Sequence, residues 1–306
     1  MLRSFFIALS ESKSMRAVAE RSAFGQKVSK RFVAGMTIDE LIAATEEMNR
    51  AGVRVTVDNL GENVTNREEA LYSRGLYHQL LDEIQKRKLD ANVSLKLTHM
   101  GLTIDEKLAR DTVIELLEHA IAVDNFVRVD MEGSPYTQKT LDFVRELNRR
   151  PNALGHVGTV LQAYLYRTEE DAHILCSEGI RIRLCKGAYK EPASIAFPHK
   201  HDVDANYVKV AKQIVKSGVF HGLATHDEKI ITTIKSWAKQ EGVAKSAFEF
   251  QMLHGVRNDL QLGLAHEGWG VRCYIPYGTE WYPYFMRRLA ERPANVLFMA
   301  KNYFKG

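Results

Sequence analysis

The chain has 306 residues, a formal net charge of +4 and the composition of an ordinary globular protein. A charge this small gives no reason to expect nucleic acid as a partner. The three cysteines are widely separated, without a CxxC pair or metal-ligand spacing, so free thiols in a reducing compartment are expected rather than disulfides or zinc.

Residues 1–35 form a basic segment, rich in Lys, Arg and Ser, whose only acidic residues are Glu11 and Glu20. The apolar run at 5–9 is too short for a signal peptide, and no run in the chain reaches transmembrane length. A transit peptide has a similar composition. Because the apolar residues recur with an unbroken helical period, we favour an amphipathic helical arm.

The next segments alternate between helix-type and strand-type patterns. A helix with a Thr37/Glu40 capping box is expected from residue 36 to residue 52. Strand-type runs follow at Val53–Asp58, Asn92–Thr98, Phe126–Glu132, His156–Gln162, Ile180–Lys186, His221–His226, Phe248–Leu253 and Val271–Ile275. The clearest helical stretches between them are Asn66–Arg87, Thr103–Val123, Thr137–Arg149, Asp202–Ser217 and Glu228–Gln240, with a weaker one at 255–266.

Eight such β–α units in about 250 residues predict an α/β protein of the (β/α)₈ barrel type. A doubly wound sheet is the alternative, but no GxGxxG sequence follows any of the strands. No low-complexity linker interrupts the pattern, and a single domain over residues 1–306 is therefore expected.

Within several predicted strands, apolar residues alternate with polar or charged ones, as in Val53–Asp58, Val127–Glu132 and Arg181–Leu184. An antiparallel sheet with one wet face has the same pattern. The intervening helices imply parallel strands, so the charged residues are expected to point into the barrel and to pair there. A surplus of cations near the strand ends would suit an anionic ligand or cofactor.

The last strand is followed by a turn through Pro276 and Gly278 and a helical segment to about residue 291. At spacings i, i+3, i+4 and i+7, one face of this segment carries Tyr284, Arg287, Arg288 and Glu291. Paired arginines beside tyrosines suit a carboxylate or a phosphate held against an apolar body. A solvated surface helix is the alternative.

Active sites of such barrels lie at the carboxyl ends of the strands. The side chains expected there are Asp58, Lys96, Asp130, Gln162, Arg183, Lys186, Thr225, His226, His254 and Tyr274. This set has cations, hydrogen-bonding groups and an aromatic ring, but neither a nucleophile–base triad nor a metal cluster, and it suits an organic cofactor. A structural Lys96–Asp130 pair, and histidines that bond only to backbone, are the alternatives at those positions.

Eight segments in this order carry a resemblance to one family. They are DNLGE at 58–62, SLKLT at 94–98, VDMEG at 129–133, LQAY at 161–164, RLCKGAYKE at 183–191, LATHD at 223–227, EFQMLHG at 249–255 and YIPYGTEWYPYFMRRLAE at 274–291. The sequence resembles the FAD-dependent proline dehydrogenases, which oxidise L-proline to 1-pyrroline-5-carboxylate by hydride transfer to the flavin in the first step of proline degradation.

The resemblance implies a distorted barrel over residues 53–291, preceded by N-terminal helices at 1–52 and followed by a C-terminal helix at 292–306. The last barrel helix is expected over the strand ends, covering FAD. The resemblance further implies substrate contacts from Lys96, Leu253, Tyr274, Tyr284, Arg287 and Arg288, and catalytic roles for Asp130 and Arg183. It implies FAD contacts from Met131, Gln162, Arg183, Lys186, Gly187, Ala188, Thr225, His226 and Glu291, and a gate formed by Glu62 and Arg287.

Two features of this sequence differ from those of some members of the family it resembles. Lys190 stands where some carry a tryptophan against the flavin, and the chain stops at Gly306, so a separate pyrroline-5-carboxylate dehydrogenase is expected downstream. The family passes electrons to membrane quinone. We therefore expect a cytoplasmic protein that contacts the inner face of the cell membrane peripherally, with the basic arm as the candidate surface.

Two other functions fit parts of the pattern. One is a phosphate-binding barrel enzyme, although no Gly-rich loop follows the last two strands. The other is a non-enzymatic protein that binds anions or membrane surfaces through the arm, which leaves the charged strand interiors without a purpose.

Overall fold

The computed structural model describes Met15, Ala19, Ser22 and residues 31–61, 64–282 and 284–286. In this part of the chain, eight parallel strands close into a barrel in sequence order, with β8 paired to β1. The strands are β1 (Arg54–Asn59), β2 (Ala91–Leu95), β3 (Val127–Val129), β4 (Val157–Gln162), β5 (Arg181–Cys185), β6 (His221–Ala224), β7 (Phe248–Leu253) and β8 (Gly270–Tyr277). The predicted (β/α)₈ architecture is confirmed.

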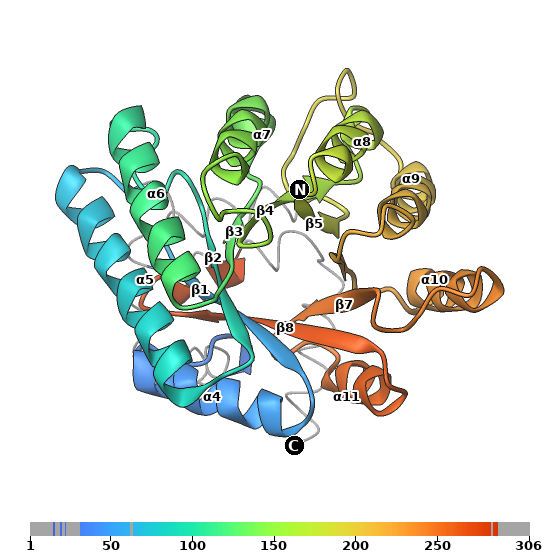
Figure 1. Cartoon of the computed structure of the whole chain (residues 1–306), viewed down its shortest axis with the longest axis horizontal. Helices are drawn as coiled ribbons and strands as arrows, with labels where there is room; N and C mark the ends of the chain where they lie inside the picture. The colour runs from blue at the N-terminus through green and yellow to red at the C-terminus, as the bar shows by residue number, and fades with distance from the viewer. Residues whose placement is uncertain are drawn as a thin grey trace.

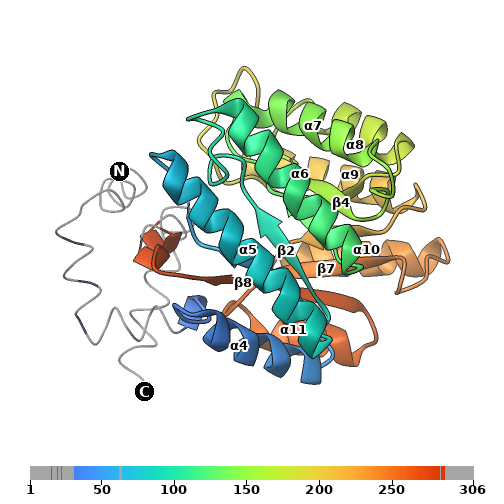
Figure 2. The same cartoon turned by 60° about the vertical axis from the view of Figure 1, so that its left-hand side comes forward.

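Helices surround the strands in Figure 1. They are α4 (Ile38–Arg50), α5 (Arg67–Arg87), α6 (Glu106–Ala122), α7 (Ser134–Asn148), α8 (Thr168–Ser177), α9 (Lys200–Val215), α10 (Glu228–Gln240) and α11 (Asn258–His266). The helix α4, which precedes the first strand, packs on β1 and β8, and Figure 2 shows it along the outside of the barrel beside α11. The α8 helix was not among the clear helical patterns in the sequence.

Local sequence sets several helix ends. The predicted capping box is present: the Thr37 side chain accepts from the amide of Glu40, whose own side chain accepts from the amide of Thr37. The side chain of Asn66 caps α5 in the same position, and that of Asp227 caps α10. These caps keep the first turns of three helices from fraying, and α10 begins directly after the end of β6.

The strand boundaries differ from the predictions at the carboxyl ends. Four predicted strands were too long, since β2, β3, β5 and β6 end at Leu95, Val129, Cys185 and Ala224. In contrast, β8 runs past Tyr274 to Tyr277 and includes Pro276, which was wrongly predicted to begin a turn. It continues because it pairs with β1 as far as Asn59, while the carbonyl of Pro276 accepts from Ala34.

The outward-facing strand residues form the main hydrophobic core between strands and helices. Val55, Val57, Val93 and Val127 are fully or almost fully buried in this layer. Burying an aliphatic side chain of this size stabilises the fold by about 1.5–3 kcal/mol. The predicted alternation is therefore observed, and it leaves the polar residues of the same strands facing the barrel interior.

A second apolar cluster lies beyond the carboxyl end of β1. Leu60 packs there with Val33 and with Trp281, Tyr282, Tyr284 and Phe285, which begin the segment after β8. The predicted continuation of that helix through residues 287–291, and the predicted C-terminal helix, lie outside the described residues. None of the described helices combines the length and the hydropathy needed to cross a membrane.

Candidate active site

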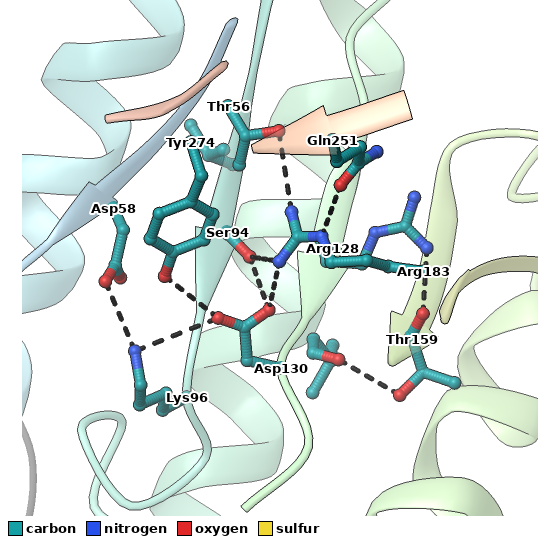
Figure 3. Close-up of polar contacts among 12 residues, drawn as sticks. Thr56, Asp58, Ser94, Lys96, Arg128, Asp130, Thr159, Arg183, Gln251 and Tyr274 are labelled. Carbon is teal, nitrogen blue, oxygen red and sulfur yellow. Dashed lines mark hydrogen bonds and ion pairs between the residues drawn. The ribbon is translucent and has the colours of Figure 1, made fainter. Parts of the chain in front are cut away.

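Arg183 occupies the middle of the barrel interior. Its Nε donates to Oε1 of Gln251 on β7 at 2.6 Å, and its Nη1 donates to Oδ1 of Asp130 at 2.8 Å. Longer bonds of 3.4 and 3.5 Å reach Ser94 on β2 and Thr56 on β1. Because these partners come from across the barrel, the inward orientation predicted from the strand alternation is confirmed (Figure 3).

Asp130 follows β3 and collects donors on both carboxylate oxygens. Ser94 Oγ donates to Oδ1 at 2.7 Å, and the Tyr274 hydroxyl donates to Oδ2 at 3.0 Å. The Nζ of Lys96 lies 3.8 Å from the same Oδ2. The expected grouping of Asp130 with Lys96 and Tyr274 is thus present, and Asp130 also holds Arg183, whose guanidinium lies 5.0 Å from the centre of the Tyr274 ring.

Asp58 is a closer partner of Lys96 than Asp130 is. The Nζ of Lys96 donates to Asp58 Oδ2 at 3.2 Å. The Tyr77 hydroxyl of α5 lies 3.3 Å from Asp58 Oδ1 and 2.7 Å from the Ser94 carbonyl oxygen, its nearer acceptor. The sequence identified Asp58 as a strand-end residue without giving it a role, and it missed Tyr77. A tyrosine on the buried face of the helix that follows β1 was the available signal for that contact.

The pKa values of Asp58 and Asp130 are shifted in opposite directions. Burial raises the pKa of Asp58, with the negative Asp130 adding to the effect, and Lys96 offsets only part of it. Burial acts in the same direction on Asp130, but Arg183, then Lys96 and the bonds from Ser94 and Tyr274 outweigh it and hold its pKa below the usual range. Two adjacent carboxylates whose pKa values move apart are able to take different roles in acid–base chemistry.

Beside this network, the ends of β4, β5 and β6 bring together several residues predicted to contact the cofactor. Lys186 Nζ donates to Asp204 Oδ1 at 2.5 Å and to Asp227 Oδ2 at 2.9 Å. Gln162 Nε2 donates to the Glu132 carbonyl at 3.0 Å. The lysine is therefore held between two carboxylates, which the sequence did not predict.

The loop after β5 contains a backbone that only glycine tolerates. Gly187 has φ of +111°, and a Cβ on it would lie 2.2 Å from Cδ1 of Tyr164. The loop is tied to its neighbour, since the Tyr164 amide donates to the Lys186 carbonyl at 2.9 Å. Glycine is therefore required here by its positive φ and by the close approach of the Tyr164 ring.

His226 bonds to the backbone of β7. Its Nε2 accepts from the Leu253 amide at 2.9 Å, which was the alternative for this histidine in the sequence. The Thr225 hydroxyl accepts from the Asp227 amide at 3.1 Å. Among the described residues, no group of three or more His, Cys, Asp or Glu is arranged to hold a metal ion.

Some of the remaining predicted site residues lie within the part of the chain that the structure describes, and others lie outside it. Met131 is buried, Ala188 and Leu253 are partly buried, and Tyr284 is buried in the cluster around Leu60. The predicted residues outside the described part of the chain are Glu62, Arg287, Arg288 and Glu291. Within the described part, Lys96, Arg183 and Lys186 face carboxylates, so the expected pairing of the inward charges is observed there.

Comparison with known proteins gives consistent matches. A family described as Proline dehydrogenase matches residues 41–301. "Proline dehydrogenase 2" of Bacillus subtilis (strain 168) is 42% identical over 304 residues, covering 99% of each chain. "Proline dehydrogenase" of Deinococcus radiodurans is 38% identical over 304 residues, covering 96% of this chain and 98% of the relative. The structure of proline utilization A from Bdellovibrio bacteriovorus, inactivated by N-propargylglycine, has the same fold, with a TM-score of 0.83 and 23% sequence identity. The match covers 94% of this chain and 36% of that chain.

Proposed function

Because the chain belongs to the proline dehydrogenase family, we propose that it oxidises L-proline to 1-pyrroline-5-carboxylate with FAD as the cofactor and membrane quinone as the final electron acceptor. In this reaction the C–H bond next to the ring nitrogen breaks, and its electron pair leaves with the hydrogen as hydride. The nitrogen loses a proton as the C=N bond forms. FAD, when bound, supplies the hydride acceptor.

The observation that carries the proposal is the Lys96–Asp130–Arg183 constellation at the carboxyl end of the barrel. Lys96 presents an ammonium group held by Asp58 and Asp130 at 3.2 and 3.8 Å, and this cation would bind the carboxylate of proline. Binding by a fixed cation orients the ring carbon next to nitrogen toward the cofactor, which is catalysis by positioning.

Asp130 and Tyr274 would form the rest of the substrate wall. Asp130 fixes the Tyr274 hydroxyl at 3.0 Å, so the tyrosine ring is held in one orientation against the substrate ring. Burial, followed by Asp130 and Asp58, raises the pKa of Tyr274, so its hydroxyl stays protonated and serves as a donor. Leu253 and Tyr284 remain proposed apolar contacts.

The residues present fit FAD. Amide, ammonium, hydroxyl and imidazole groups that suit a diphosphate and a ribityl chain come from Gln162, Lys186, Thr225 and His226 at three neighbouring strand ends, with Gly187 and Ala188 in the loop after β5. Arg183 would lie at the edge of the isoalloxazine, where a buried cation favours negative charge on a reduced flavin. Met131 is proposed as a further FAD contact.

Four proposed residues lie outside the described part of the chain. Arg287 and Arg288 would join Lys96 on the carboxylate, Glu291 would contact FAD, and Glu62 would pair with Arg287 to close the site. A separate pyrroline-5-carboxylate dehydrogenase would consume the product. Contact with the inner face of the membrane through the basic arm remains a proposal as well.

Spectroscopy of the purified protein tests the function. We expect flavin absorbance that bleaches anaerobically on addition of L-proline, and FAD as the cofactor released on denaturation. A colourless protein after purification with excess FAD, or FMN as the released cofactor, would contradict the proposal.

A Lys96→Met variant tests the substrate site. Removing one partner from a desolvated ion pair costs about 3–5 kcal/mol, so kcat/KM for proline should fall by about 10²-fold or more while flavin content stays near normal. Lys139→Met, which removes a surface lysine paired with Glu106, is the matched control. A loss below fivefold in Lys96→Met would remove Lys96 from the substrate site.

A further inference from the structure

A cavity of about 280 Å³ opens at the amino end of the barrel, away from the candidate active site. Its lining comes from the segments that lead into β2, β3, β4 and β5 and includes Arg128, Arg181, Arg272, His156 and Glu249. Pockets for drug-sized ligands occupy about 300–1,000 Å³, so this cavity has room for a smaller molecule.

Two arginines at this end have their charge compensated. Arg272 Nε donates to Glu249 Oε1 at 2.6 Å, and its Nη1 donates to Asn92 Oδ1 at 2.7 Å. Arg54 lies 3.3 Å from Asp90 and 3.5 Å from Glu249. The carboxylates of Glu249 and Asp90 are therefore already engaged.

Arg128 has no such compensation. Its side chain is almost fully buried, and its Nη1 donates to the carbonyls of Thr159 and Arg181 at 2.8 Å each. A guanidinium has five N–H donors, but the buried Nε of Arg128 has no partner. None of the described carboxylates lies within ion-pair distance of it, and a buried cation with unused donors is unfavourable unless something accepts from it.

Arg181 lies next to Arg128 and has the same deficit. Its Nη1 makes one long bond of 3.4 Å to the Gly155 carbonyl, and its Nε is buried without a partner. Both guanidiniums lie against the ring of Phe126, at 4.7 Å for Arg128 and 4.5 Å for Arg181. The ring holds the two cations close together at the wall of one cavity.

The charges at this site repel one another. Burial, followed by the guanidiniums of Arg183 and Arg181, lowers the pKa of Arg128, while the more distant carboxylates of Glu249 and Asp130 offset only part of this effect. Burial, then Arg272 and Arg54, lowers the pKa of Arg181, with Glu249 acting in the opposite direction. Arginine stays protonated in proteins, so an anion in the cavity would relieve this repulsion.

We propose that this cavity binds a small oxyanion, inorganic phosphate or a short carboxylate, between Arg128 and Arg181. Guanidinium groups match such anions because they offer parallel N–H donors in a planar fork. Gly158 leaves the space for Arg128, since a Cβ there would lie 3.0 Å from Nη1 of Arg128. The site shares none of the residues proposed to contact proline or FAD, and it does not depend on the proposed function.

Isothermal titration of the purified protein with inorganic phosphate, and separately with succinate, tests the site. We expect binding that persists in Lys96→Met, where the proposed substrate site is disabled, and that weakens about tenfold or more in Arg181→Met. The methionine keeps an apolar stem against Phe126 while removing the charge. Tighter binding of phosphate would identify a phosphate site, and tighter binding of succinate a carboxylate site.

Arg110→Met is the matched control. Arg110 also stacks on a phenylalanine, Phe143 at 5.0 Å, and lines a cavity of about 170 Å³, but it has Glu146 as an ion-pair partner. Its replacement should leave anion binding unchanged. A loss in Arg110→Met equal to that in Arg181→Met would show a general charge effect and overturn the site.

A second variant keeps the proposal testable if Arg181→Met does not fold. Asp124 is exposed on the rim of the cavity with φ of +52°, a conformation that asparagine tolerates. Asp124→Asn removes a negative charge and should tighten anion binding in low salt. No binding at millimolar anion, binding that disappears in Lys96→Met, or unchanged affinity in Asp124→Asn would each overturn the proposal.

Discussion

The two ends of this barrel hold buried charges in different ways. At the carboxyl end, Lys96 and Arg183 face Asp58 and Asp130, so each cation has a carboxylate partner. At the amino end, Arg272 is paired with Glu249, whereas Arg128 bonds to two backbone carbonyls and lies against an aromatic ring. The same strand alternation turns both sets inward. An inward-facing charged residue in a strand therefore indicates a buried polar site. Whether that charge is paired with a carboxylate determines which ligands the site can bind.

Replacing Arg183 should give the largest effect on stability. Arg183→Met leaves Asp130 buried without its closest cation, and removing one member of a buried pair costs about 3–5 kcal/mol. Urea unfolding monitored by circular dichroism measures the loss. Arg110→Met, which breaks a pair at the surface, should lose less than about 1 kcal/mol.

A double-mutant cycle sharpens this result. If the loss comes from the orphaned carboxylate, then adding Asp130→Asn to Arg183→Met should recover part of the stability. Additive losses in the double variant would show that Arg183 stabilises the barrel through Gln251 and packing rather than through Asp130.

The carboxyl end should also be sensitive to acid through His99, which is buried and bonds Ser73 Oγ at 2.8 Å. Burial, followed by Lys96, lowers the pKa of His99 to about 4. An unfolded histidine takes up its proton near pH 6.5, so the contribution of neutral His99 is complete above that pH and is lost as the pH falls toward 4. The loss should reach about 3 kcal/mol.

Unfolding free energies of His99→Gln across pH 7 to 4 check this expectation. The variant should lack most of that pH dependence, whereas His201→Gln, at an exposed position, should keep it. Parallel pH profiles for the wild type and His99→Gln would show that the histidine does not titrate in this window.

At the amino end, the packing around Gly158 should be sensitive to added side-chain volume. In Gly158→Ala, the new Cβ would lie 2.2 Å from the Arg181 carbonyl oxygen and 2.8 Å from Cζ of Phe126. Overpacking of this kind costs about 1–3 kcal/mol. Differential scanning calorimetry should show a lower Tm.

Gly75→Ala provides the control, because Gly75 lies inside α5 and an added Cβ meets nothing within 4 Å. That change should stabilise the protein by about 0.5–1 kcal/mol. Equal Tm values for Gly158→Ala and the wild type would mean that the arginines at this end are not closely packed.

A more modest effect is expected at the Lys186 cluster. Burial alone would raise the pKa of Asp227, but the bond from Lys186 and the charges of Lys186 and Lys200 lower it to about 2. The resulting stability is present above about pH 4 and is lost as the pH falls toward 2. After allowance for solvent screening, we expect about 1–2 kcal/mol.

Acid titration of Asp227→Asn, followed by near-ultraviolet circular dichroism, measures that contribution. Between pH 4 and 2 the free energy of unfolding should fall less in this variant than in the wild type, whereas Asp202→Asn, at a partly exposed position, should keep the wild-type fall. An acid transition identical to that of the wild type would mean that Lys186 does not depend on Asp227.

Much of the fold followed from sequence because it depends on short-range periodicity. Alternation in strands such as Val53–Asp58, with helices between them, determines parallel strands and an inward polar face. The capping box at Thr37 and Glu40 is local and was also predictable. The continuation of β8 through Pro276 was not, because it depends on pairing with β1, more than 200 residues away in the chain.

The partners within the site depend on how the strands are staggered. Asp58 pairs in register with Ser94, and Lys96 follows two residues later, so its ammonium reaches back to Asp58. The sequence alone does not determine the register between neighbouring strands. The nearest partner of Lys96 was therefore not predictable. The contact from Tyr77 required, in addition, the position of α5 against β1 and β2.

Barrel closure through β1 and β8 has a consequence for synthesis of the chain. Arg272 Nη1 donates to the carbonyl of Val55, 217 residues earlier, and six register pairs join the two strands. At roughly 5–20 residues per second, a ribosome needs roughly 10–45 s to proceed from Asn59 to Tyr277. During that interval one edge of β1 lacks its final partner, and unpaired edges recruit other strands. Until β8 has been made, this edge of β1 has to be kept from pairing with strands of other chains.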